Sequence, residues 1–86
     1  MMRQQAIELA LASLSPTVLN IQDESHKHAG HAGAQDGRGH FKLLIVSEQF
    51  TGLSMLKRHQ LVYQALAELL KTDIHALSIQ AKTPSE

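Results

Sequence analysis

Residues 41–47, FKLLIVS, form an apolar run that places hydrophobic side chains on both faces of an extended chain. Such a run is typical of the central strand of a sheet. Residues 50–52 then predict a turn, and Ser54 is suited to cap a helix that continues to about Lys71. The stretch therefore predicts a central strand followed by a long helix.

Apolar spacing predicts the remaining elements around this unit. Residues 3–14 have the spacing of an amphipathic helix, which Ser15-Pro16 ends. Residues 17–23 and 74–81 alternate as strands do. The inward-facing side chains are expected to be Ile7, Ala10, Leu11 and Leu14 in the first helix, Leu19 and Ile21 in the first strand, Met55, Val62, Leu66 and Leu69 with Leu70 beside them in the long helix, and Leu77 and Ile79 in the last strand.

The predicted order is α-β-β-α-β, which indicates one small α/β domain. A hairpin makes the first two strands antiparallel, and a right-handed crossover through the long helix makes the second and third parallel. We therefore expect a three-stranded mixed sheet packed by helices over residues 1–82, with residues 83–86 as a polar C-terminal tail. Residues 24–39, ESHKHAGHAGAQDGRG, lack a large apolar group and predict a flexible loop rich in His and Gly.

The composition excludes several classes of function. The 86 residues include no cysteine, so the chain has no disulfide, no thiolate nucleophile and no all-thiolate iron–sulfur site of its own. The net charge of zero argues against a strongly electrostatic nucleic-acid binder. Glu24, Ser25 and His28 are close in sequence but occupy a loop without an evident oxyanion site, so we expect no enzymatic activity.

The distribution of apolar residues predicts where the protein works. No apolar run approaches the ~20 residues of a membrane span. The N-terminal residues also lack the uninterrupted apolar segment of a secretory signal. We therefore expect a cytoplasmic protein that does not enter a membrane.

Four of the six histidines lie between positions 26 and 40. His26, His28 and His31 form an H-x-H-x-x-H pattern, for which a solvated polar loop and a metal-binding loop are both open. His75 opens the last strand, whose start lies at the same sheet edge as this loop if the crossover is right-handed. Alternation places His75 on the same face of the strand as Leu77 and Ile79. Because it is the first of these residues it lies at the rim, where metal ligation and edge packing are both open.

The remaining histidines and the basic residues have structural interpretations beside functional ones. His59 lies within the apolar stripe of the long helix, which favours a packed side chain. His40 precedes the central strand and is expected to be structural, with orientation of a metal ligand as the alternative. The basic residues that would contact a nucleic acid are Arg38, Lys42, Lys57 and Arg58, although scattered solvated charges are commoner.

Several short motifs occur in an order that resembles the BolA family. They are Asp23-Glu24-Ser25 followed by His28, then His40-Phe41, Val46-Ser47, Phe50-x-Gly52, Arg58-His59-x-x-Val62-Tyr63, His75-Ala76-Leu77 and Thr83-Pro84. The resemblance covers about residues 5 to 84. It implies a fold like that of class II KH domains.

The resemblance also implies a partner and a cofactor. It implies a heterodimer with a monothiol glutaredoxin, bridged by a [2Fe–2S] cluster, in iron–sulfur trafficking or iron sensing. The partner's cysteine and a glutathione thiolate would hold one side of the cluster. His75 and His28 would hold the other, with His26 and His31 as alternates for the loop ligand. Mixed histidine and thiolate ligation is known from Rieske centres.

The alternative function is that of a DNA-binding transcriptional regulator. Some members of the family are described as regulators that affect cell shape and stress responses. This function would use the KH-like fold and the four basic residues named above. The sequence leaves open whether the chain forms a homodimer.

Overall fold

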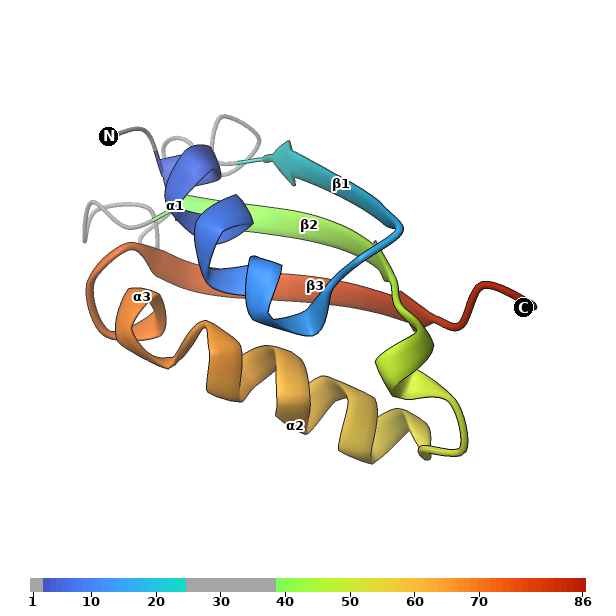
Figure 1. The fold of residues 1–86 in the computed structure, drawn as a ribbon. Coiled ribbons are helices and arrows are strands. Elements are labelled where there is room, and N and C mark those ends of the chain that lie inside the picture. The colour runs from blue at the N-terminus through green and yellow to red at the C-terminus, as the bar shows by residue number, and fades with distance from the viewer. Residues whose placement is uncertain (1–2, 25–38) are drawn as a thin grey trace.

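Three strands form one mixed sheet in the order β1–β2–β3 (Figure 1). The computed structural model describes residues 3–24 and 39–86. Its elements are α1 (Arg3–Leu11), β1 (Val18–Asp23), β2 (Gly39–Val46), α2 (Met55–Ala65), α3 (Ala67–Thr72) and β3 (Ile74–Lys82), with 3₁₀ turns at Ala12–Leu14 and Glu48–Phe50. β1 pairs with β2 antiparallel and β2 with β3 parallel. The predicted topology and the central place of β2 are confirmed.

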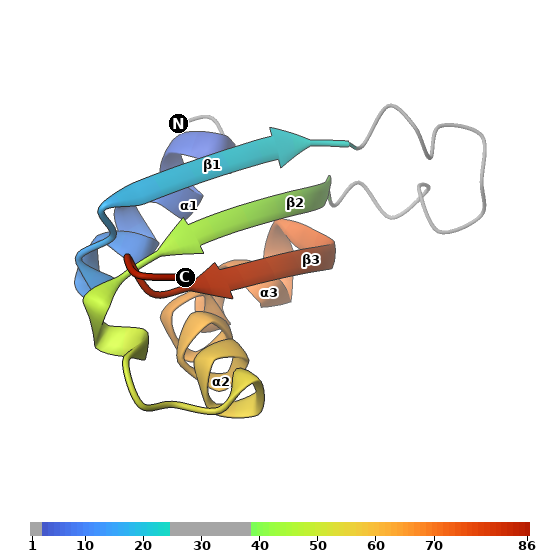
Figure 2. The same ribbon diagram turned by 90° about the vertical axis from the view of Figure 1, so that its right-hand side faces the viewer.

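The helices lie on one face of the sheet and leave the other face open (Figure 2). Phe41, Leu43 and Ile45 point from β2 toward the helices and are buried, whereas Lys42 points to the open face and is exposed. None of the helices in the two described ranges is long and apolar enough to span a membrane.

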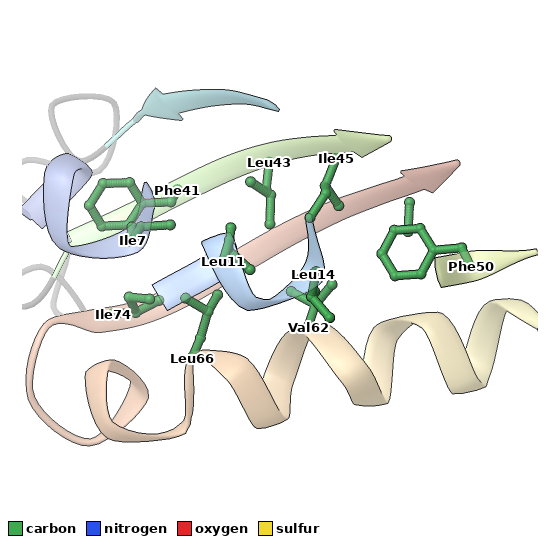
Figure 3. Close-up of a cluster of buried hydrophobic side chains, with 11 residues drawn as sticks. Ile7, Leu11, Leu14, Phe41, Leu43, Ile45, Phe50, Val62, Leu66 and Ile74 are labelled. Carbon is green, nitrogen blue, oxygen red and sulfur yellow. The ribbon is translucent and has the colours of Figure 1, made fainter. Parts of the chain in front are cut away.

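The core fills the space between the sheet and the helices (Figure 3). Its buried apolar residues are Ile7, Leu11, Leu14, Phe41, Leu43, Ile45, Phe50, Val62, Leu66, Ile74 and Ala81. The predicted inward positions Ala10, Leu19, Ile21, Leu69, Leu70, Leu77 and Ile79 are partly buried against this cluster. Among the described residues, the core therefore lies in a single layer between the sheet and the helices.

The long helix differs from its prediction in two ways. It divides at Leu66, whose backbone (φ −99°, ψ 9°) ends α2 and precedes α3 while its side chain stays in the core. Ser54 caps α2 as predicted, since its Oγ accepts from the Lys57 backbone N–H at 3.2 Å. The inward position of Met55 is wrong, because this side chain is 56% exposed and Arg58 is the buried residue in that part of the helix.

Arg58 joins α2 to the end of β3. Its Nε donates to the Leu53 carbonyl at 3.0 Å and its Nη1 to the Ala81 carbonyl at 3.2 Å. The two Nη atoms donate to the Glu86 carboxylate at 2.7 and 2.9 Å, and Glu86 also accepts from the Thr83 backbone N–H at 3.1 Å. The hydrogen bonds from Arg58 lower the pKa of Glu86 to about 2. The guanidinium is therefore occupied within the fold, which contradicts its predicted role as a nucleic-acid contact.

A β-bulge interrupts the start of β3. Gly39 pairs with Ile74, but His40 pairs with Ala76, so His75 is an extra residue between two paired positions. Ile74 enters the core with 1% exposure and His75 is exposed. The prediction that His75 lies on the same face of β3 as Leu77 and Ile79 is therefore wrong, because the bulge shifts the alternation by one position.

The bulge predicts that two adjacent residues contribute very differently to stability. Ile74→Val should lower the free energy of unfolding by about 0.5–1.5 kcal/mol, because it removes a buried methylene. His75→Ala should change it by no more than about 0.5 kcal/mol, because the side chain is exposed. Urea unfolding followed by circular dichroism measures both values. A larger loss for His75→Ala than for Ile74→Val would contradict the bulge.

The Arg58–Glu86 contact predicts a loss of stability in acid. Because the folded state lowers the pKa of Glu86 from 4.5 to about 2, the stabilisation is present above pH 4.5 and is lost as the pH falls toward 2. Glu86→Gln should therefore be less stable than the wild type at pH 7, and the difference should shrink between pH 4.5 and 2.

Urea unfolding at several pH values measures this difference. Glu68→Gln is the matched control. The Glu68 side chain is 87% exposed and pairs with Lys71 at 3.5 Å on the surface, where ion pairs contribute little. A difference between Glu86→Gln and the wild type that is independent of pH would contradict the ion pair.

Candidate functional site

The parallel pairing of β2 and β3 brings the starts of both strands to one edge of the sheet. The Gly39 backbone N–H donates to the Asp73 carbonyl at 2.8 Å, and the Glu24 N–H donates to the His40 carbonyl at 2.7 Å. Glu24 and Gly39 flank the segment 25–38, so His75 lies at the edge where this segment joins the sheet. This part of the prediction is confirmed.

His40 and His75 form the centre of the candidate site. Their ring centroids are 5.1 Å apart, and the ring planes are tilted by 55°. His40 is half-buried with its Nε2 atom buried, whereas His75 is exposed. The sequence prediction missed this contact, although the parallel register, which sets His40 opposite Ala76, is the signal that could have found it.

A shallow pocket of about 200 Å³ is lined in part by His40. Its lining residues are Glu24, His40, Phe41, Ala76, Leu77 and Ser78. In the ranges 3–24 and 39–86, no group of three or more His, Asp or Glu side chains is arranged to hold a metal ion. The described residues can therefore offer an imidazole at this edge, and a metal centre would need most of its ligands from elsewhere.

The other predicted histidines do not join this pair in the described structure. His26, His28 and His31 lie outside the described residues. His59 is half-buried on α2, which agrees with the packed interpretation. Its imidazole belongs to no metal-binding cluster of described residues.

The predicted basic residues do not gather into one patch where the structure describes them. Arg38 lies outside the described residues, and Arg58 is buried in its contact with Glu86. Lys42 is exposed on the open face of the sheet, where it lines a hollow of about 170 Å³. Lys57 is exposed in the first turn of α2, on the helical layer. Phosphate binding needs clustered basic side chains, and these two lysines lie on different layers.

Comparison with known proteins identifies the family. The profile of the BolA family, described as BolA-like protein, matches residues 11–86. The chain is 53% identical over 76 residues to the chloroplastic protein BOLA1 of Arabidopsis thaliana, covering 85% of this chain and 48% of that protein. It is 40% identical over 86 residues to the DNA-binding transcriptional regulator BolA of Escherichia coli, covering all of this chain and 79% of that protein.

Solved structures show the same fold. BolA1 from Arabidopsis thaliana superimposes with a TM-score of 0.85 at 42% identity, over all of this chain and 96% of that one. The BolA domain of SufE1 from the same plant superimposes with a TM-score of 0.83 at 43% identity, over 99% and 96%. The chain spans about half or less of the length of the first curated relatives, 21% of SufE-like protein 1 and 48% of BOLA1. With a family match over most of its length and these shared structures, the chain belongs to the BolA-like family.

Proposed function

We propose that the protein is a non-enzymatic, cytoplasmic partner of a monothiol glutaredoxin and supplies histidine ligands to a bridging [2Fe–2S] cluster. Its role would be iron–sulfur trafficking or iron sensing. The observation that carries the proposal is the exposed imidazole of His75 at the sheet edge, projected from a bulge beside His40. The histidine-rich segment joins the sheet at the same edge.

The donors of this chain fit one half of such a cluster. Neutral imidazole ligates iron beside thiolates in Rieske centres. The sequence contains no cysteine, so any thiolate ligands must come from the partner and its glutathione. His75 would be one ligand and His28 the second, with His26 or His31 as the alternates. The cluster itself would supply the chemistry, either by accepting and donating electrons or by being transferred to another protein.

The shape of the site favours a shared centre over a buried one. Among the described residues, the pocket of about 200 Å³ is shallow and open, so these residues do not enclose a cofactor by themselves. An exposed ligand at a rim is instead accessible to atoms of a second protein. The occurrence of a BolA domain within the longer chain of SufE1 supports a module that works in combination with other domains.

One observation favours the alternative of a DNA-binding transcriptional regulator. The Escherichia coli relative, 40% identical over the full chain, carries that description. The burial of Arg58, the separation of Lys42 from Lys57 and the net charge of zero weigh against it. We therefore propose the cluster-binding function first.

The ligand role of His75 predicts a spectroscopic change that depends on this residue. When the wild-type chain is mixed anaerobically with a cluster-loaded monothiol glutaredoxin and glutathione, the visible circular dichroism of the cluster should change. His75→Ala should abolish this change or weaken complex formation at least about tenfold, because even changes to residues that support a metal ligand cost 10–100-fold.

His59→Ala is the matched control, since it removes a histidine from α2 and should behave as the wild type. His28→Ala, His26→Ala and His31→Ala in the same assay identify the loop ligand. Identical spectra and affinities for the wild type and His75→Ala would refute the ligand role.

The DNA alternative makes a separate prediction. Titration of duplex DNA at about 0.15 M salt should give no sequence preference over an unrelated duplex, and Lys57→Ala should change little. Sequence-specific binding that falls steeply with salt and weakens in Lys57→Ala would favour the regulator instead.

A further inference from the structure

The contact between His40 and His75 joins a fixed ring to an exposed one. The His40 ring is half-buried and its Nε2 atom is buried, whereas His75 is exposed at the bulge. The centroid distance of 5.1 Å and the tilt of 55° are within the range of favourable contacts between flat rings. The His40 ring therefore limits the space in which the His75 ring can turn.

The backbone of His40 is held from both sides. On one side its carbonyl accepts from the Glu24 N–H at 2.7 Å. On the other side Gly39 donates to the Asp73 carbonyl at 2.8 Å, and His40 is paired with Ala76 in the parallel register. A residue in a central strand with such neighbours provides a stable surface for the exposed His75 side chain.

A histidine side chain has several staggered rotamers available to it. A metal ligand has to adopt one of them, and the loss of side-chain freedom on binding weakens the complex. From these observations we propose that His40 is a positioning residue, which holds the His75 imidazole in a restricted set of orientations before a partner arrives. The use of this orientation in cluster binding rests on the proposed function above.

The Nε2 atom of His40 is buried, so a metal ion outside the fold cannot reach this nitrogen. This nitrogen faces the protein and not a docking partner. His40 therefore acts through its ring contact with His75, and the shape of its side chain matters more than its basicity. A residue of similar shape, such as phenylalanine, should preserve the effect.

The test measures the His75 side chain in the free, full-length chain. NMR three-bond couplings report the populations of its χ1 rotamers in the wild type, His40→Ala, His40→Phe and His59→Ala. The wild type and His59→Ala should favour one rotamer, His40→Ala should show averaging, and His40→Phe should restore the preference. Far-ultraviolet circular dichroism and slow amide exchange in β2 and β3 check that each variant is folded.

A second arm links this orientation to binding. His40→Ala should bind the cluster-loaded glutaredoxin about three- to tenfold more weakly than the wild type, with the same cluster spectrum, and His40→Phe should recover most of the affinity. If His40→Ala leaves the His75 rotamers unchanged, the positioning role is refuted. If His40→Phe loses the cluster spectrum as fully as His75→Ala, His40 is itself a ligand and the proposal is also refuted.

The two proposals fail in different ways. If His40 orders the His75 ring but the His75→Ala variant binds the glutaredoxin normally, the positioning role stands and the proposed function is refuted. If the cluster spectrum depends on His75 but the His75 rotamer populations do not depend on His40, the proposed function stands and the positioning role is refuted.

Discussion

The parallel pairing of β2 with β3 is the constraint on which the site depends. The crossover through α2 and α3 returns the chain so that both strands begin at one edge of the sheet (Figure 2). There the Gly39 backbone N–H donates to the Asp73 carbonyl. An antiparallel pairing would have put the start of β3 at the opposite end of β2. The same register that joins the strands places His40 opposite Ala76, and the bulge then sets His75 beside the His40 ring. Topology and one extra residue together produce the pair of histidines.

β3 is anchored at both ends, which gives its exposed histidine a rigid base. At its start, Ile74 lies in the core with 1% exposure. Near its end, the Ala81 carbonyl accepts from Arg58, and the same guanidinium binds Glu86 beyond the strand. Stability and function therefore use different residues of one strand. The buried residues and Arg58 hold the fold, and His75 is the exposed residue that the proposed function assigns to a partner.

The sequence predicted the topology well because the decisive signals were local and strong. The apolar run predicts β2 as the central strand, and a long helix separates it from the last strand. A right-handed crossover through that helix then leaves few other ways to pair the two strands. The bulge was not predictable in this way, since Ile74 and Leu77 are both apolar and periodicity alone does not show which of them begins the inward face. Hydropathy also selected Met55 over Arg58 for the core, because a stripe of apolar residues cannot show that a guanidinium will find carbonyl and carboxylate acceptors. The contact of His40 with His75 depends on the register between distant segments, and the histidines predicted as loop ligands lie outside the described residues.

The proposed role as a cluster partner requires that His75 is exposed and points away from the core, and the structure places it beside His40. Nuclear Overhauser effects between ring protons in the free chain measure this placement most directly. The structure predicts contacts between the His75 and His40 rings, together with contacts across β2 and β3 that follow the bulged parallel register. Contacts from the His75 ring to the Leu77 and Ile79 methyl groups, with none to His40, would instead place His75 on the core face and contradict the account.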